Sequence, residues 1–244
     1  FLRERRKWVK YAIVLFCEYF LVRSSDICVV TSETDMTDMN SLYRHQKVQL
    51  LPNWAFDDEI RIHGKKPIDL QHIKCCFIGR LTKEKNVDYI IDFVQNLKNF
   101  SLDLYGLIFD DIESTTQFDK KKICFKGQVQ NNLLLKRLQD YDFIILASKM
   151  EGHPKALIEA MAHGVVPICT EAPGIKQIIK NRFNGLIISG NDVDYDKNML
   201  YNYLEFLDIN ELSKKAKETV RNLSLQKITQ RELHYLESAL FDSK

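Results

Sequence analysis

Two loops of this sequence carry side chains that could bind a charged ligand. In the first, residues 78–85 (IGRLTKEK), Gly79 follows an apolar run and lets the chain turn sharply. Arg80 and Lys85 then precede a helical segment, and a guanidinium with an ammonium beside a helix start suits a diphosphate. A solvated basic loop would have the same composition, so this loop alone leaves both interpretations open.

The second loop, residues 148–164 (SKMEGHPKALIEAMAHG), joins an apolar run to a helical segment, with Pro154 at the first helical position. The first N–H groups of a helix have no partner inside it, and they favour an anion or sugar oxygens. We therefore expect the start of this helix to line a ligand site. The residues concerned are Gly152, His153, Pro154, Lys155 and Ala156.

Two carboxylates flank the same helix start. Glu151 lies before it and Glu159 lies in its second turn, so the pair could reach different parts of one ligand. Carboxylates accept hydrogen bonds from paired sugar hydroxyls well. Glu159 alone would more often be a surface residue, but with Gly152, Pro154 and Gly164 it forms a much more specific pattern.

Alternating apolar and helical segments after residue 72 must position both loops. Near-continuous apolar strands separated by helices predict a parallel sheet covered on both faces, which is a doubly wound α/β domain. In such a sheet ligands bind at the carboxyl ends of the strands, where both loops fall. We expect strands at 73–78, 102–105, 123–125, 143–147, 165–169 and 186–188, and helices at 87–97, 131–139, 154–163 and 175–180.

The segments on either side of this domain are shorter. Residues 55–69 are polar and contain Gly64 and Pro67, so they are the best linker candidate, with a solvated acidic run at 57–59. Trp8 and Trp54 are expected to pack rather than to stack on a ligand. The remaining expected elements are a helix at 3–22, a strand at 26–31, a helix at 33–43 capped by Ser32, a strand at 47–51 and a charged helical tail from 192.

Composition and absent motifs exclude several function classes. The chain is 45% hydrophobic and 28% charged, which suffices for a core and argues against disorder. A net charge of +2 gives no footprint for bulk nucleic-acid binding. The nine glycines never fall as GxGxxG, GxxxxGKS or GxxxxGKT, which argues against dinucleotide cofactors and P-loop nucleotides.

Cysteines and clustered carboxylates give no metal signature. None of the six cysteines forms a CxxC pair, and the adjacent Cys75 and Cys76 indicate buried thiols in a reducing compartment. Asp192, Asp194 and Asp196 imitate a metal-binding DxD motif, but they begin a polar loop after a strand. Helix capping is therefore their expected role.

The first apolar stretch, residues 11–22, is too short to span about 30 Å of hydrocarbon as a helix. It contains Glu18, and no small-residue cleavage site follows it, so a signal peptide is not favoured. We expect a buried or amphipathic helix. The basic residues before it could instead touch an anionic membrane, and they are Arg3, Arg5, Arg6, Lys7 and Lys10.

With these motifs in this order, residues 72–190 resemble the donor-binding half of the retaining GT-B glycosyltransferases of family 4, the group 1 glycosyl transferases. The resemblance rests on the Glu-x7-Glu signature from Glu151 to Glu159 and on three further motifs. They are GRLTKEKN at 79–86, FKGQV at 125–129, and APGIKQII with FNGLII at 172–188. Residues 23–33 and 47–53 resemble the last elements of the family's N-terminal domain, and NLSLQKITQRELHYLES resembles its closing helix.

The resemblance implies roles on the phosphate side of a UDP-sugar or GDP-sugar donor. Arg80 and Lys85, at the turn made by Gly79, would bind the diphosphate and stabilise its departing charge. The backbone N–H groups of Lys155 and Ala156 would contact the same phosphates. Family members need no metal for the reaction, so we expect no metal and no cofactor besides the donor.

It also implies roles for the residues around the sugars and the base. Glu159 would hold the ribose hydroxyls. Glu151, with the amides of Gly152 and His153, would hold the transferred sugar. The turn that ends at Val129 would lie near the base.

The expected activity is retaining transfer of a hexose-type sugar to a glycan or lipid-linked acceptor, in surface polysaccharide or lipopolysaccharide synthesis. The implied location is the bacterial cytoplasm, with peripheral contact at the inner face of the membrane and no nucleic-acid partner. The alternative is a nucleotide-sugar-binding module without turnover of its own. A protein-interaction domain with a dead site is disfavoured because it would not need Arg80, Lys85, Glu151 and Glu159 together.

The chain also departs from the family pattern. Pro173 replaces the first glycine of a usual Gly-Gly pair, and Lys176-Gln177 replaces the usual x-Glu, in a loop that lies near the sugar in relatives. Most of the N-terminal domain has no counterpart. None of His45, His63, His72, His163 and His234 is expected to replace its catalytic-region histidine. We expect the end of an N-terminal acceptor domain at 1–55, a linker at 56–71, a donor domain at 72–225 and a closing helix at 226–244.

Overall fold

The computed structural model describes the backbone of residues 2–43, 48–61, 67–108 and 118–242. Side chains are described for residues 13–42, 48–60, 67–108 and 118–241. The chain divides into two compact units, one comprising Phe1–Pro52 with Ile228–Lys244 and the other comprising Asn53–Lys227. The second unit contains both loops that are predicted to bind a ligand.

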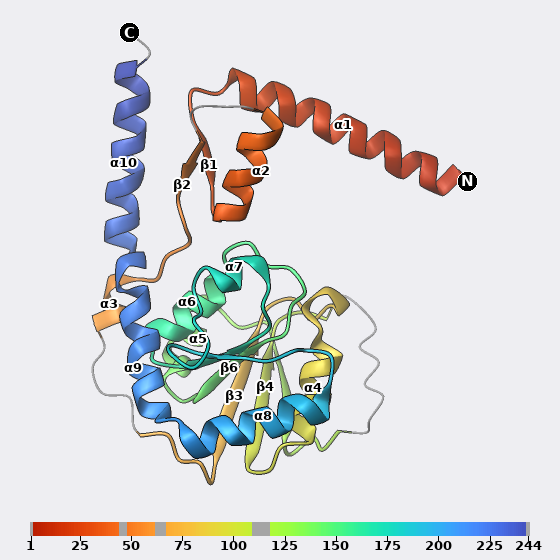
Figure 1. The fold of residues 1–244 in the computed structure, drawn as a ribbon, viewed down its shortest axis with the longest axis vertical. Helices are drawn as coiled ribbons and strands as arrows, with labels where there is room; N and C mark the ends of the chain where they lie inside the picture. The colour runs from red at the N-terminus through yellow and green to blue at the C-terminus, as the bar shows by residue number, and fades with distance from the viewer. Residues whose placement is uncertain (1, 44–47, 62–66, 109–117, 243–244) are drawn as a thin grey trace. The chain divides into compact units, whose positions relative to one another are not determined.

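The unit Asn53–Lys227 is built on one sheet of six parallel strands in the order β5-β4-β3-β6-β7-β8 (Figure 1). The order reverses between β3 and β6, so the carboxyl ends of these two strands mark the switch point at which such sheets bind ligands. The predicted doubly wound α/β fold is confirmed. The strands are β3 (Ile73–Ile78), β4 (Phe100–Tyr105), β5 (Ile123–Gly127), β6 (Phe143–Leu146), β7 (Val166–Cys169) and β8 (Leu186–Ile187).

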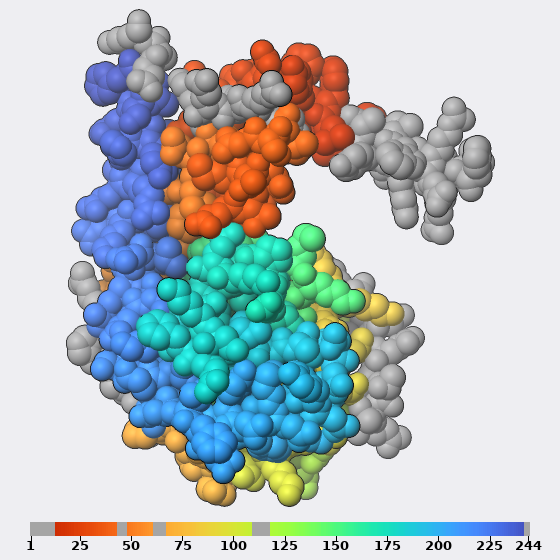
Figure 2. Space-filling model, viewed as in Figure 1, coloured from red at the N-terminus to blue at the C-terminus, as the bar shows by residue number. Residues whose placement is uncertain are grey.

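Helices cover the strands of this sheet. In Figure 1, α4 lies on one side of the strands and α5 and α6 lie on the other. α4 packs against β4 and α8, while α6 packs against β7 and α9. In Figure 2 the teal and light-blue atoms in the region of α7 and α8 form the front of this unit. The helices are α3 (Asp57–Arg61), α4 (Val87–Gln95), α5 (Asn131–Leu138), α6 (Lys155–Ala162), α7 (Pro173–Lys176), α8 (Val193–Phe206) and α9 (Ile209–Thr219), with short 3-10 turns η1 (Lys83–Lys85) and η2 (Val220–Leu223).

The core of this unit forms because the strands are almost wholly apolar. Every residue of β6 and β7 is buried, as expected for strands covered on both faces. Phe77 of β3, Phe93 of α4 and Phe143 of β6 are fully buried in one cluster. This packing fixes the strand ends from which the two loops emerge.

The unit formed by Phe1–Pro52 and Ile228–Lys244 has the predicted order of helix, strand, helix and strand. Its two strands are parallel, with Cys28 paired to Val48. The Ser32 hydroxyl accepts a hydrogen bond from the Asp35 N–H at 3.1 Å, which confirms the predicted cap. The elements are α1 (Leu2–Ser24), β1 (Cys28–Val30), α2 (Glu33–Tyr43), β2 (Val48–Leu50) and the part of α10 (Leu225–Asp242) from Ile228 onward.

The first helix differs from the expectation of a buried or amphipathic helix. Val22 is buried, but large apolar side chains such as Ile13, Phe16 and Leu21 are 57%, 64% and 69% exposed. The run 11–22 is apolar on every side of the helix, so packing of one side at Val22 leaves apolar side chains on the other sides exposed. In the described parts of the chain no helix has the length and hydrophobicity to cross a bilayer. The side chains of Arg3, Arg5, Arg6, Lys7, Trp8, Lys10, His45 and His63 lie outside the described ones.

The segment predicted to be a linker is partly folded. Ala55 is fully buried, and its N–H and C=O groups bond to Leu223 and Leu225, each at 2.9 Å. Residues 57–61 form α3, in which Glu59 is only 7% exposed, so the expectation of a solvated acidic run is wrong for Glu59. The error has a physical cause, because backbone hydrogen bonds anchor this segment and leave no trace in its composition.

The helix that follows β7 has different bounds from those predicted. The late helix spans Pro173–Lys176 rather than 175–180. It begins earlier because the fixed backbone angle of Pro173 suits a first helical turn.

Candidate functional site

The loop after β3 turns as predicted, against the loop after β4. The Gly79 N–H donates to the Tyr105 carbonyl at 3.0 Å. A Cβ on Gly106 would lie 1.8 Å from the Gly79 carbonyl oxygen, so only glycine fits there. Asn86 then takes a left-handed conformation (φ 56°), and its side-chain amide donates to the Gly190 carbonyl at 2.9 Å. These contacts fix the turn that carries Arg80 and Lys85.

Lys85 and Glu151 meet, although they come from different strand ends. The Lys85 Nζ lies 2.7 Å from the Glu151 Oε1, and the two side chains are 17% and 11% exposed. Arg80 does not join them in the described structure. It is 62% exposed and lies 3.7 Å from Glu84 of its own loop. The structure therefore brings together one cation and one carboxylate of the predicted site and leaves Arg80 at its surface.

The loop after β6 is held by backbone contacts. The Gly174 N–H donates to the Glu151 carbonyl at 2.9 Å. A Cβ on Gly174 would lie 1.4 Å from the Gly152 carbonyl oxygen, so this close approach requires glycine. The conformation of this loop therefore depends on Gly174, which follows Pro173 in the segment where the chain differs from the family pattern.

The start of α6 lies one residue later than predicted. Pro154 is the N-cap residue, with an extended backbone (φ −69°, ψ 109°), and the helix begins at Lys155. The Pro154 carbonyl accepts the first bonds of the helix, from Leu157 and Ile158. Among the described residues the N–H groups of Lys155 and Ala156 have no acceptor, as is usual in the first turn of a helix.

Glu159 is buried beside the positively charged Lys155. It is 5% exposed, and its Oε1 has the Lys155 Nζ at 3.4 Å. Burial raises the pKa of Glu159, and interactions with Lys155 and Asn131 oppose that rise. The ring of His163 bonds to the Glu159 carbonyl at 2.9 Å, which agrees with the structural role expected for that histidine.

The contacts of residues 53–59 with α6 were not predicted from the sequence. The Lys155 Nζ donates to the Trp54 carbonyl at 2.8 Å and lies 3.5 Å from the centre of the Trp54 ring. Burial, reinforced by the charge of Glu159, raises the pKa of Glu59 to about 7. The two aromatic residues Trp54 and Phe56 were the available signal, since a solvated linker rarely carries such a pair. Trp54 packs, as expected, but it packs on a residue of the predicted site.

Val129, which is predicted to lie near the base, is half-buried against the core. It comes two residues after Gly127, whose φ is 65°.

The aspartates that resemble a DxD motif have structural contacts. Asp192 caps α8 by accepting a hydrogen bond from the Tyr195 N–H at 2.9 Å, which confirms its predicted role. Asp196 is fully buried and binds the N–H groups of Ser189 and Gly190 at 2.8 and 2.9 Å. Within the described residues no three His, Cys, Asp or Glu side chains group as a metal site would require.

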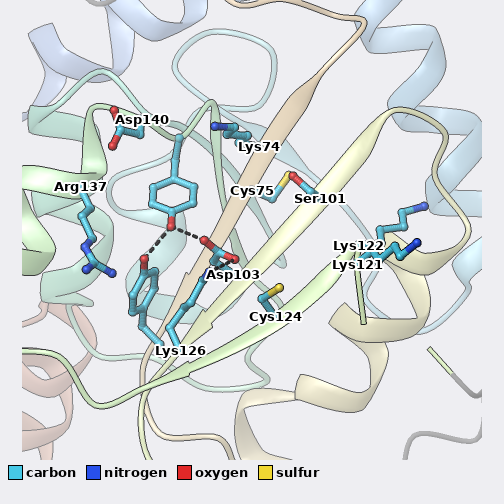
Figure 3. A pocket seen from close by; sticks show the side chains of 12 residues that line it. Lys74, Cys75, Ser101, Asp103, Lys121, Lys122, Cys124, Lys126, Arg137 and Asp140 are labelled. Carbon is cyan, nitrogen blue, oxygen red and sulfur yellow. Dashed lines mark hydrogen bonds and ion pairs between the residues drawn. The ribbon is translucent and has the colours of Figure 1, made fainter. Parts of the chain in front are cut away.

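A separate pocket of about 370 Å³ lies over β4 and β5 (Figure 3). In it the Tyr141 hydroxyl donates to Asp103 at 2.6 Å and lies 2.6 Å from the Tyr105 hydroxyl, while Lys126 pairs with Asp103 at 3.2 Å. This chain of bonds joins β4 to the turn before β6 and is structural. No residue of the predicted site lines the pocket, which is formed by Lys74, Cys75, Ser101, Asp103, Tyr105, Lys121, Lys122, Cys124, Lys126, Arg137, Asp140 and Tyr141.

The fold and these contacts define a doubly wound α/β domain with charged groups gathered at its switch point. Residues 58–222 match the family described as glycosyl transferases group 1. Because that match covers more than half of the chain, the protein belongs to the group 1 glycosyl transferases.

A curated relative of this chain is also a glycosyltransferase. The chain is 28% identical over 156 residues to the Escherichia coli UDP-Gal:alpha-D-GlcNAc-diphosphoundecaprenol alpha-1,3-galactosyltransferase, covering 59% of this chain and 40% of the relative. The chain spans about half the length of the curated relatives it matches.

Two solved structures show the same fold, that of the GT-B glycosyltransferases. One is a sucrose-phosphate synthase from Thermosynechococcus elongatus, with a TM-score of 0.75, 17% identity, and coverage of 94% of this chain and 62% of that one. The other is Anabaena HepE in complex with UDP, with a TM-score of 0.72, 13% identity, and coverage of 88% and 65%.

Proposed function

We propose that this chain binds a nucleoside-diphosphate sugar and forms the donor-binding part of a glycosyltransferase. The observation that carries the proposal is the meeting of Lys85 and Glu151 at 2.7 Å, from the two strand ends of the switch point. A cation, a carboxylate and free backbone N–H groups in one sheet-end site match the diphosphate and the hydroxyls of one donor molecule.

On the phosphate side, Lys85 and Arg80 bind the diphosphate and stabilise the charge that develops as it departs. The N–H groups of Lys155 and Ala156 bind the same oxygens. With two cations and two backbone donors in place, the developing charge is compensated by the chain's own groups, and we propose a reaction that needs no metal.

On the sugar side, Glu151 binds hydroxyls of the transferred hexose, together with the amides of Gly152 and His153. Glu159 binds the ribose, and Val129 lies beside the base. The contact between Lys85 and Glu151 suits this division, because the diphosphate and the sugar are joined to each other in the donor. Charge compensation by Lys85 also lets a carboxylate stand close to a phosphate without strong repulsion.

For the whole protein, we propose transfer of a hexose-type sugar with retention to a glycan or lipid-linked acceptor, in surface polysaccharide or lipopolysaccharide synthesis. The name of the Escherichia coli relative, a galactosyltransferase that uses UDP-Gal and a lipid-linked acceptor, supports this class of reaction. HepE in complex with UDP supports a nucleotide donor. Lipid-linked acceptors would place the protein at the inner face of the membrane.

Calorimetric titration with UDP, GDP and their hexose derivatives tests the proposal. Binding of one diphosphate series, unchanged by a chelator, is the expected result and identifies the base. Loss of binding on adding the chelator would refute metal independence. Assay of sugar transfer by the same protein then separates a transferase from a module that binds without turnover.

A further inference from the structure

Asn53 makes two hydrogen bonds to one residue of the proposed sugar loop. Its backbone N–H donates to the Nδ1 of His153 at 3.1 Å, and its side-chain amide donates to the His153 carbonyl. The two residues are 100 positions apart, and both are half-buried. Asn53 therefore binds both the ring and the backbone of His153.

The ring contact fixes which nitrogen of His153 carries the proton. A backbone N–H can only donate, so the Nδ1 that receives it must be unprotonated. Burial lowers the pKa of His153 to about 4, so the ring is neutral at physiological pH. A neutral imidazole carries one proton, and here that proton must be on Nε2.

The backbone contact completes the anchoring of the loop. The Glu151 carbonyl is bound by the Gly174 N–H at 2.9 Å, and the His153 carbonyl is bound by Asn53. With both of these carbonyls held by the protein, the loop between them has little freedom to rotate. The N–H groups of Gly152 and His153 find no acceptor in the described part of the chain, so they are the groups left for a ligand.

Trp54, the next residue, also contacts the segment that contains His153. The Trp54 carbonyl accepts from the Lys155 Nζ at 2.8 Å, and the Trp54 ring lies under that ammonium. Asn53 and Trp54 therefore bind two nearby residues, His153 and Lys155, at the same time. This explains why a segment with a linker-like composition is ordered beside α6.

We propose that Asn53 is a positioning residue for the loop Glu151–His153. It holds His153 as the tautomer protonated on Nε2 and fixes the loop backbone, so that the amides of Gly152 and His153 face the transferred sugar. The sugar half of this inference rests on the proposed function, whereas the tautomer and the anchoring do not.

Three variants test the contact between Asn53 and His153 through its effect on donor binding. His153→Asn keeps an acceptor near the position of Nδ1, His153→Gln moves the acceptor to the position of Nε2, and Asn53→Ala removes the side-chain donor. The measurement is the affinity for UDP and UDP-glucose or UDP-galactose, and for GDP and GDP-mannose. Its readout is the ratio between each nucleotide sugar and its free diphosphate in the series that binds.

We expect His153→Asn to keep this ratio within about twofold, because its acceptor still meets the Asn53 N–H. His153→Gln and Asn53→Ala should lower affinity for the nucleotide sugar about tenfold and leave the diphosphate affinity unchanged, as the loss of one hydrogen bond predicts. Unchanged ratios in all three variants would overturn the inference. Equal loss for diphosphate and nucleotide sugar would also overturn it, since that indicates general damage to the fold.

A second measurement keeps the inference testable if the chain binds no nucleotide at all, which would instead be a failure of the proposed function. Nitrogen-15 spectra of histidine-labelled protein, with His153→Gln to assign the signal, report the tautomer directly. We expect a protonated Nε2 and an unprotonated Nδ1, and faster exchange of the Gly174 amide in Asn53→Ala. A proton on Nδ1, or unchanged exchange, would overturn the inference.

Discussion

Lys85 and Glu151 are 66 positions apart in the chain, and their side chains meet at 2.7 Å in a setting where each is less than one-fifth exposed. Ion pairs at this degree of burial are not weakened by water as surface pairs are, and loss of one partner leaves the other charge poorly solvated. The pair therefore links the ends of β3 and β6 as well as serving the proposed ligand. Variants of the two residues should have different effects on binding.

Lys85→Met should weaken binding of the free diphosphate and of its sugar derivative by similar factors, about 10- to 100-fold, because both carry the phosphates. Glu151→Gln should weaken only the sugar derivative, since its carboxylate is assigned to the sugar. Calorimetry on both variants checks this. Lys83→Met, in the same turn but exposed, is the matched control and should bind both ligands normally. Equal losses in Lys85→Met and Glu151→Gln would contradict the division of roles.

Arg80→Ala should weaken diphosphate ligands far more than the free nucleoside. Its side chain is 62% exposed and pairs only loosely with Glu84 at 3.7 Å, so its removal should leave stability nearly unchanged. Titration with UDP against uridine, or GDP against guanosine, measures the difference. Similar losses for nucleotide and nucleoside would refute a phosphate role for Arg80.

Glu159→Ala should reduce nucleotide affinity by about 1–3 kcal/mol, the usual loss when hydrogen bonds to hydroxyls are removed. Deoxyribose nucleotides offer a second readout, because the wild type should discriminate against them and the variant should not. Glu205→Ala, on the exposed surface of α8, serves as the control. Unaltered affinity of Glu159→Ala for the ribonucleotide would rule out the ribose assignment.

Glu59 should make the protein less stable as the pH rises. Its pKa is about 7 in the folded chain and about 4.5 otherwise, so the folded state retains a proton that the unfolded state loses. The resulting stability is full below pH 4.5 and is lost as the pH rises through 7, by about 3 kcal/mol at most. In Glu59→Gln this component should vanish.

Urea unfolding of Glu59→Gln and wild type at pH 5 and pH 8 measures this component. The difference between the two proteins removes contributions from other groups, such as His153, whose pKa burial lowers to about 4. Asp58→Asn, at an exposed neighbouring position, should behave like the wild type. If stability changed with pH by the same amount in Glu59→Gln and in the wild type, Glu59 would not be buried as described.

Gly174→Ala should destabilise the chain by more than about 3 kcal/mol, or prevent folding, because its Cβ would lie 1.4 Å from a backbone oxygen that cannot yield cheaply. Gly127→Ala is the contrasting control. It meets no atom within 4 Å and costs only the strain of a φ of 65°, about 1–2 kcal/mol. Unfolding curves for both variants would contradict the described loop packing if Gly174→Ala were the milder change.

The sheet could be predicted from sequence because its strands are short apolar runs that end at glycine or a polar loop. The site residues near the strand ends could be predicted from that sheet, since Gly79 follows β3 directly and Glu151 lies in the loop after β6. The ion pair of Lys85 with Glu151 could not be predicted, because it depends on the side-by-side placement of β3 and β6. Local patterns carry no information about such distant partners.

The start of the predicted linker, residues 55–59, was misjudged for a related reason. Its polar composition indicated a linker, but its order comes from bonds of Ala55 to Leu223 and Leu225 and, just before it, of Asn53 to His153. Glu59 was expected in solvent because most glutamates are exposed. Its burial beside Glu159 arises only after α6 is in place, which no window of sequence around residue 59 reveals.

The most direct test of the account is a map of the backbone amides that respond when UDP or GDP is added to nitrogen-15-labelled protein. We predict that the amide signals of residues 79–86 and of Gly152, His153, Lys155 and Ala156 shift in a saturable manner, and that the sugar derivative shifts Gly152 and His153 further. Shifts confined to the pocket lined by Asp103 and Tyr141, or no saturable shift with either nucleotide, would contradict donor binding at the ends of β3 and β6.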